Sequence, residues 1–329
     1  MNNNKKSKLR ITNFMQIIIF AQNKKMMSAP IIIFAYNRPR HTEKVIKSLL
    51  LNKEAKDSDL IVYCDGAKNE EDTAKVAEVR NLVNKITGFK KITSVFRDKN
   101  IGLAKNIIDG VTKVFETYDT AIVLEDDLVV TPLFLKYMNS ALKFYEKSDV
   151  QSVSGYTPPV TIPENYNFTT YSIMRNCSWG WATWKDRWMN TDWEVTDFKD
   201  FISNSKLRKE FNQSGSDLCT MLLKQQTGVI NSWSIRFCYS GYKKKLKTIY
   251  PVLSLVVNNG ADGSGTNIKS TSKYQSDLFL DDELTNFNFV SDTTVNPIIL
   301  KSFRKTYNCS IVRRIINYCK LKKYLNSHQ

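Results

Sequence analysis

The chain has 329 residues, enough for one large domain or two ordinary ones, and its hydrophobic content of 42% and charged content of 24% are typical of a globular protein. The formal net charge is +16, but residues 1–28 carry six Lys/Arg and residues 301–329 carry eight, without any acid. Residues 29–300 hold the other 34 basic residues and all 32 acidic ones. A body this close to neutral argues against nucleic-acid binding, which needs a basic face.

From residue 30, short apolar runs alternate with amphipathic segments. We expect strands at 30–36, 60–64, 92–96, 121–124 and 150–154, and helices at 41–51, 71–86, 102–118 and 132–145. Strands and helices that alternate at this spacing predict right-handed βαβ crossovers. The expected fold class is therefore α/β, with a mostly parallel sheet flanked by helices.

Polar residues follow four of these expected strands. They are Asn37-Arg38, Asp65-Gly66, Arg97-Asp98 and Glu125-Asp126-Asp127. Ligands of parallel sheets bind beyond the carboxyl ends of the strands, so these side chains are expected at the binding edge. Three adjacent carboxylates repel one another unless a cation is present, and Mg²⁺ or Mn²⁺ would also bind phosphate groups. A solvated turn is the alternative for the triplet. Arg38 is a candidate phosphate ligand or a plain loop residue.

The second half of the chain is rich in tryptophan and ends in a basic segment. Residues 175–195 contain Trp179, Trp181, Trp184, Trp188 and Trp193, which fill a core or line a sugar site. The glycine-rich segment 258–266 is a loop, either a plain turn or a lid over a ligand. At the end of the chain, apolar residues recur at helical spacing between Lys and Arg in residues 310–325.

The charged ends of the chain suggest where the protein works. A basic N-terminal appendage (1–28) and a basic amphipathic C-terminal tail (301–329) suit a cytoplasmic protein held at the anionic inner face of the plasma membrane. A packed terminal helix with a basic outer face explains the C-terminal pattern equally well. No segment reaches the roughly 18–20 apolar residues of a membrane span.

Seven segments resemble the GT-A glycosyltransferases, and within them N-acetylglucosaminyltransferase I and related bacterial sugar transferases. They occur in the family's order and span about residues 30–270: 31–39 (IIIFAYNRP), 61–66 (IVYCDG), 100–104 (NIGLA), 123–137 (VLEDDLVVTPLFLKY), 179–184 (WGWATW), 231–236 (NSWSIR) and 262–266 (DGSGT). The resemblance implies a GT-A fold with a donor-binding half at 29–160 and a mixed α/β acceptor-side half at 161–300.

The same resemblance implies roles for individual residues. Asp127 would bind the Mn²⁺ or Mg²⁺ that bridges the diphosphate of a nucleotide-sugar donor. Glu125 would face the donor sugar and Asp126 the ribose. Arg38 would contact phosphate or ribose, and Asp65 the nucleobase. The further implied contacts are Asn100, Trp233, Gly263 and Ser264 for the donor, and Trp179 and Trp181 on the acceptor side.

The chain departs from the family at the catalytic base. An inverting transferase needs a carboxylate to accept the proton of the acceptor hydroxyl. The family places an aspartate beside the residue equivalent to Trp233, where this chain has Asn231, Ser232 and Ser234. Other acids would have to supply the base. The candidates are Asp186, Asp192, Asp217 and Asp262.

These observations favour a metal-dependent, inverting glycosyltransferase, specific for a hexose or N-acetylhexosamine. Its acceptor would be a glycan or lipid-linked saccharide of a bacterial surface polysaccharide. One alternative is a sugar-phosphate nucleotidyltransferase, although residues 35–39 (AYNRP) lack the glycine-rich loop which that class carries after its first strand. The other alternative is a catalytically weak carbohydrate- or membrane-binding protein on a transferase scaffold, suggested by the missing base.

Overall fold

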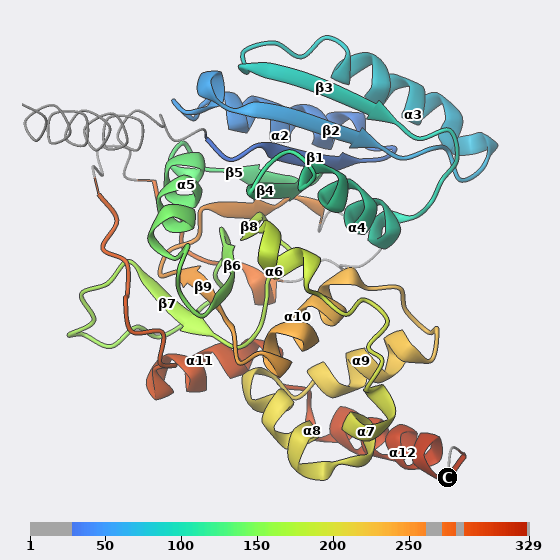
Figure 1. Ribbon diagram of the computed structural model, residues 1–329, viewed down its shortest axis with the longest axis vertical. Coiled ribbons are helices and arrows are strands. Elements are labelled where there is room, and N and C mark those ends of the chain that lie inside the picture. Colours follow the sequence, from blue (N-terminus) through green and yellow to red (C-terminus); the bar gives the residue numbers. More distant parts are fainter. Residues whose placement is uncertain (1–27, 261–271, 281–285, 328–329) are drawn as a thin grey trace, which may run out of the picture.

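The computed structural model describes residues 28–260, 272–280 and 286–327 and is built around one eight-stranded sheet (Figure 1). Its strand order is β3-β2-β1-β4-β8-β6-β9-β7. The strands are β1 (Ile31–Ala35), β2 (Asp59–Cys64), β3 (Lys91–Phe96), β4 (Thr120–Glu125), β6 (Val150–Ser154), β7 (Thr170–Ile173), β8 (Trp181–Trp184) and β9 (Lys247–Pro251). A second, two-stranded sheet pairs β5 (Leu128–Val130) with β10 (Val256–Asn258).

The large sheet is mostly parallel, as the sequence predicted. Strands β3, β2, β1 and β4 run in parallel, and β6 and β9 form a second parallel pair. Strand β8 lies between β4 and β6 and is antiparallel to both, and β7 is antiparallel to β9. All five predicted strands are present, and β7, β8 and β9 of the second half join the same sheet.

The alternation of β1 explains how both faces of the sheet are covered. Ile31 and Ile33 point to one face and join the core with α2 (Pro39–Leu50), α3 (Glu70–Val83) and α5 (Phe134–Phe144). Ile32 and Phe34 point to the other face and pack with α4 (Leu103–Val114) and a group of tryptophans. The four helices predicted for the first half are confirmed, and each buries an apolar stripe.

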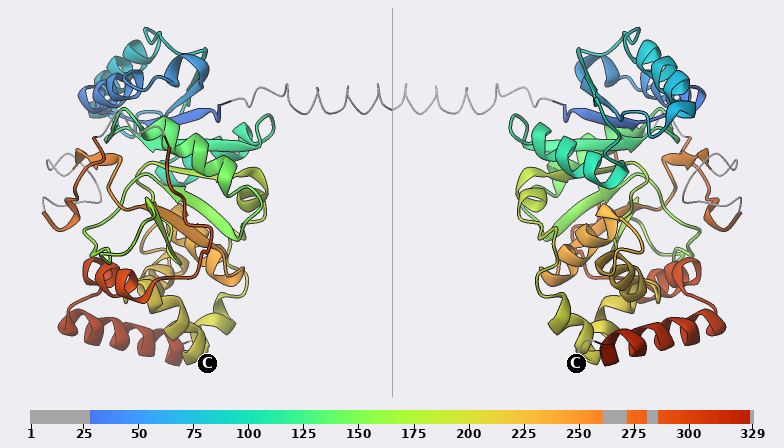
Figure 2. Two further views of the ribbon diagram at one scale, coloured as in Figure 1. Left: turned by 90° about the vertical axis from the view of Figure 1, so that its left-hand side faces the viewer. Right: turned by 90° about the vertical axis from the view of Figure 1, so that its right-hand side faces the viewer.

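The second half adds helices beyond the sheet. They are α6 (Lys185–Met189), α7 (Phe198–Ser203), α8 (Ser205–Phe211), α9 (Leu218–Gln226), α10 (Trp233–Lys243), α11 (Pro297–Tyr307) and α12 (Ile311–Ser327), with 3₁₀ turns η1 (Ala55–Asp57), η2 (Asn212–Ser214) and η4 (Ser272–Tyr274). Helices α7 to α10 bury a core of their own, on which α12 packs. In both views of Figure 2, α11 and α12 lie at the end of the molecule opposite α3. No helix in the described part of the chain combines the length and apolar character that a membrane crossing requires.

Candidate functional site

The acidic triplet lies where β4 ends, beside the end of β1. The parallel register pairs Phe34 with Glu125, so the residues that follow β1 lie next to the residues that follow β4. Arg38 donates from Nη1 to Oδ2 of Asp127 at 3.0 Å and from Nη2 to Oδ1 of Asp126. The structure thus brings Arg38 together with the triplet at the sheet edge that the sequence predicted.

One carboxylate oxygen of Asp127 is left without a hydrogen-bond partner among the described residues. Its backbone carbonyl accepts a hydrogen bond from the Asn259 N–H at 2.8 Å. Its Oδ1 is buried and has no hydrogen-bond partner among the described residues, although buried polar atoms are normally paired. Gly260 leaves room beside this carboxylate, because a Cβ at that position would collide with Oδ2 of Asp127. Gly260 is a site residue that the sequence did not single out.

These features fit a divalent cation that is held by one protein carboxylate and completed by substrate phosphates. The described residues contain no group of three or more His, Cys, Asp or Glu side chains that would hold a metal on their own. Mg²⁺ is often held by one or two carboxylates together with water and substrate phosphates. Asp127 would supply the protein ligand of such an ion, and a diphosphate would supply most of the others.

The triplet concentrates more negative charge than Arg38 neutralises. Burial and the neighbouring carboxylates of Asp127 and Asp126 raise the pKa of Glu125 to about 8, against the opposing effect of Arg38. Burial also raises the pKa of Asp126, although Arg38 acts in the opposite direction. Because burial opposes the charged forms of Glu125 and Asp126 and Arg38 is a single positive charge, the site favours an added cation.

A second network fixes the loop that carries Arg38. The Tyr36 hydroxyl donates to Oδ2 of Asp72 at 2.6 Å, and the Asn37 amide donates to Oδ1 of the same carboxylate at 2.6 Å. The Tyr36 backbone N–H donates to Oδ2 of Asp126 at 3.2 Å. Asp72, in the first turn of α3, therefore supports the site from a distance. No sequence pattern indicated this role of Asp72.

Asp65 and Asn100 stabilise one loop at the same edge. The Asp65 carboxylate accepts hydrogen bonds from the backbone N–H groups of Gly66, Ile101 and Gly102 at 2.9–3.0 Å. The Asn100 amide donates to the Gly66 carbonyl at 2.9 Å. In this structure both side chains thus shape the loop. A contact of Asp65 with a nucleobase stays a prediction.

The predicted aromatic residues occupy different environments. Trp181 and Trp233 are 1% and 3% exposed, and their rings stack on each other with centroids 4.7 Å apart. The Trp188 ring also stacks on Trp181, with the ring centroids 5.4 Å apart. Trp181 and Trp233 are therefore core side chains, without an exposed ring face for a sugar. Aromatic residues cluster in cores as readily as in binding sites, so the sequence pattern did not separate the two.

Trp179 lies at a cavity. Its half-buried ring makes edge contacts with Tyr156, at 4.4 Å between centroids, and with Tyr274, at 5.7 Å. The cavity has a volume of about 500 Å³, and its lining also includes Asn258 and Asn259. Because Asn259 hydrogen-bonds the Asp127 backbone, this cavity adjoins the acidic edge. Its size and aromatic lining are typical of small-ligand pockets.

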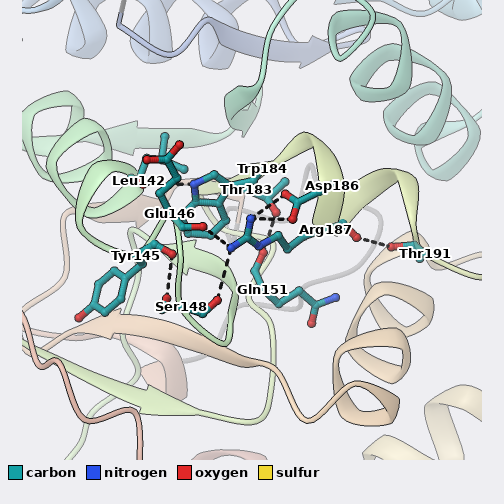
Figure 3. A network of polar contacts seen from close by, with 10 residues as sticks. All are labelled: Leu142, Tyr145, Glu146, Ser148, Gln151, Thr183, Trp184, Asp186, Arg187 and Thr191. Atoms are coloured by element: carbon teal, nitrogen blue, oxygen red, sulfur yellow. Dashed lines mark hydrogen bonds and ion pairs between the residues drawn. The ribbon is translucent and has the colours of Figure 1, made fainter. Parts of the chain in front are cut away.

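Asp186 lies at the wrong edge of the sheet to act as a base beside the triplet. The antiparallel register pairs Trp184 with Thr120, at the start of β4, so Asp186 follows β8 at the edge opposite Asp127. Arg187 donates to both Asp186 oxygens at 2.7 and 2.8 Å and also to the carbonyls of Glu146 and Ser148 (Figure 3). The Asp186 side chain belongs to this surface network.

The other predicted bases are held elsewhere or lie outside the described residues. Asp192 accepts hydrogen bonds from three backbone N–H groups, of Glu194, Val195 and Thr196, and so closes a turn. Asp217 forms two hydrogen bonds with Arg175, at 2.8 and 2.9 Å. The predicted residues Asp262, Gly263 and Ser264 lie outside the described part of the chain.

Comparisons with known proteins agree with this architecture. Residues 31–200 match the family model described as Glycosyl transferase family 2. A search of curated proteins found no match.

A comparison with solved structures found matches that include three proteins 11–13% identical in sequence to this chain. One is galactosyltransferase LgtC in complex with donor and acceptor sugar analogues, at 12% identity and a TM-score of 0.34, covering 67% of this chain and 72% of that one. Another is UDP-glucose pyrophosphorylase complexed with UDP-glucose, at 11% identity and a TM-score of 0.34. The match covers 68% of this chain and 90% of that one. The third is a cytidylyltransferase from Leptospira borgpetersenii serovar Hardjo-bovis, at 13% identity and a TM-score of 0.29. The match covers 50% of this chain and 63% of that protein.

Proposed function

Because the chain belongs to glycosyl transferase family 2, we propose that it transfers a sugar from a nucleoside-diphosphate donor to a glycan or lipid-linked saccharide, with Mn²⁺ or Mg²⁺ at Asp127. The observation that carries the proposal is the buried, unpartnered Oδ1 of Asp127 beside Arg38 at the carboxyl edge of the sheet. Ligands of open α/β sheets bind at this edge.

The departing nucleoside diphosphate makes the main electrostatic demand of such a reaction. A divalent cation bound at this edge supplies Lewis-acid stabilisation of the diphosphate. Arg38, whose guanidinium joins Asp126 and Asp127, is positioned to exchange one carboxylate for a phosphate oxygen, since its planar fork suits both. Gly260 lets the Asp127 carboxylate lie against the backbone at residue 260, where a Cβ would displace it.

The sugar-binding part of the proposal concerns the cavity at Trp179. Sugar CH faces pack against aromatic rings, and Trp179, Tyr156 and Tyr274 supply such rings beside Asn258 and Asn259. The side-chain amides provide hydrogen-bonding groups for sugar hydroxyls. A hexose or an N-acetylhexosamine is the proposed donor sugar, and a bacterial surface polysaccharide precursor is the proposed acceptor. The narrower relationship to N-acetylglucosaminyltransferase I belongs to the same proposal.

For the inverting mechanism we take Asp262 as the first candidate for the base. Asp186, Asp192 and Asp217 each engage other groups, as described above. Ser234, beside Trp233, instead accepts a hydrogen bond from the Asn176 amide at 3.1 Å and cannot replace a carboxylate near neutral pH. Asp262→Asn should lower kcat at least about 100-fold with donor binding retained, the usual share of a general base. An equal loss in Asp217→Asn with Asp262→Asn active would reassign the role.

Calorimetric titration of nucleotide sugars with and without Mn²⁺ tests the proposal as a whole. Metal-dependent binding of at least one donor is expected, and Asp127→Asn should abolish the metal dependence. Asp186→Asn is the matched control, because that carboxylate lies at the other edge of the sheet. Failure of all donors to bind would refute the proposal.

A panel assay of donor hydrolysis separates transfer from binding alone. A donor that binds but is neither hydrolysed nor transferred would favour a carbohydrate-binding protein on this scaffold, a reading suggested by the missing acid beside Trp233.

A further inference from the structure

The first half of α12 exposes a row of large apolar side chains to solvent. Leu321, Tyr324 and Leu325 pack on the core formed by α7 to α10. On the same helix the exposed apolar side chains are Ile311 (76%), Val312 (68%), Ile315 (58%), Ile316 (40%) and Tyr318 (56%). Ile311 and Ile315, like Val312 and Ile316, are four residues apart and share a helix face. This exposed apolar row differs from the solvent-facing surface of an ordinary amphipathic helix, which is polar.

The row is concentrated rather than scattered. Of the sixteen large apolar side chains that are exposed in the described residues, five lie within the eight residues 311–318. Single exposed apolar residues are normal, whereas a contiguous patch indicates an interaction surface. Figures 1 and 2 show α12 at one end of the molecule, with no other described element beyond it.

The surroundings of the row are strongly basic. Arg313, Arg314, Lys320, Lys322 and Lys323 belong to α12, and residues 301–329 contain no acid. Behind α12 lies a cavity of about 430 Å³ whose lining includes Arg208, Lys209, Arg304 and Arg314 and no acidic side chain among the described residues. An apolar row bordered by cations matches the boundary between lipid tails and anionic headgroups.

From these contacts we infer that α12 is a docking helix for an anionic lipid surface, with Ile311, Val312 and Ile315 inserted between headgroups and the flanking arginines and lysines bound to phosphate. A second copy of the chain is a poor occupant, because a two-fold contact would place identical cations against one another. Single-stranded nucleic acid is also a poor occupant, because it binds through stacked aromatic rings and the row is mainly aliphatic. The inference does not depend on the proposed function.

Vesicle sedimentation of the full-length chain tests the inference. The wild type should bind vesicles of phosphatidylcholine with phosphatidylglycerol and bind pure phosphatidylcholine far more weakly. The double variant Ile311→Gln/Ile315→Gln should lower the partition coefficient at least about tenfold, since two buried aliphatic side chains are removed. The matched control is Leu51→Gln/Val229→Gln, which replaces two equally exposed side chains (66% and 67%) elsewhere and should leave binding unchanged.

Charge is tested separately from apolar insertion. Replacing Arg313, Arg314 and Lys320 by Gln should weaken binding to anionic vesicles roughly fivefold per cation and reduce its dependence on salt. Residues 1–28 carry six cations of their own, so some binding should remain in every α12 variant. Two results would overturn the inference. One is unchanged binding of the Ile311/Ile315 variant, and the other is a wild-type dimer, seen by light scattering, that the same substitutions dissociate.

Discussion

Among the described residues, Arg38 is the only side chain that forms ion pairs with both Asp126 and Asp127, and it therefore acts as the local counter-charge. A metal at Asp127 would compete with Arg38 for the same carboxylate, because both cations lower the same repulsion. Under the proposed function, the guanidinium and the metal would therefore be alternatives in the free protein and would act together only when a diphosphate supplies negative charge for both.

We predict that Arg38→Gln makes the free protein less stable and more responsive to metal. Losing one partner of a largely buried ion pair should cost about 3–5 kcal/mol. Mn²⁺ should therefore raise Tm more in the variant than in the wild type, while nucleotide affinity falls. Thermal unfolding with and without Mn²⁺ measures both, and Arg40→Gln, on the exposed side of α2, is the control. Equal metal-induced shifts would contradict this role.

Gly260 gives a second prediction at this scale. In Gly260→Ala the new methyl group must displace the Asp127 carboxylate, since the space is already filled by Oδ2. Metal-dependent donor binding should weaken by about tenfold or more, the effect of a misplaced ligand group. Titration calorimetry measures it, and an unchanged circular dichroism spectrum shows that the fold is intact. Normal binding would mean that the loop at 260 moves aside freely.

At the scale of elements, two tryptophans at and just before the start of β8 have different environments. Trp179 is a candidate binding residue and Trp181 is a core residue. Trp179 precedes the strand and lines the cavity, whereas Trp181 begins the strand and lies in the core. Trp181→Ala should lower the free energy of unfolding by about 3–5 kcal/mol, as large core truncations do. Trp179→Ala should cost much less stability but weaken sugar binding. Urea unfolding and titration with an acceptor saccharide measure these effects in the two variants, and similar results for both would refute the distinction.

The elements show why sequence reasoning succeeded in the first half and stopped short in the second. Strand β1 is a buried apolar run followed by a proline-initiated helix, so local pattern alone marked both. Strand β8 has only four residues, three of which are Trp, Ala and Trp, and the same letters suit a sugar site. Its place between β4 and β6 depends on pairings with residues about 30 and 60 positions away.

The site shows the same limit. The acids of the triplet and Arg38 follow strands, so the topology alone predicted that they meet. Asp72 contacts Tyr36, which is 36 residues away in the sequence, and Gly260 contacts Asp127, which is 133 residues away. A local sequence pattern does not predict contacts of this kind. The sequence did not identify the catalytic base for a related reason. A lone aspartate has no spacing that distinguishes a turn residue from a proton acceptor.

At the scale of the whole molecule, the predicted halves 29–160 and 161–300 share one sheet. Strand β8 of the second half is hydrogen-bonded to β4 and β6 of the first half, and β9 is hydrogen-bonded to β6. If the second half unfolded alone, both edges left in the first half would expose unpaired backbone groups, which is unfavourable in a buried sheet. The two halves are therefore expected to be a functional division but a single folding unit.

This coupling predicts one cooperative unfolding transition for the chain. Differential scanning calorimetry should give a single peak with a ratio of calorimetric to van't Hoff enthalpy of about one. Donor and Mn²⁺ should move the whole peak to higher temperature, because ligand bound to any part of a single unit stabilises all of it. The Trp181→Ala variant should shift the same single peak downward. Two resolved peaks, of which only one responds to donor, would show that the halves unfold independently in spite of the shared strands.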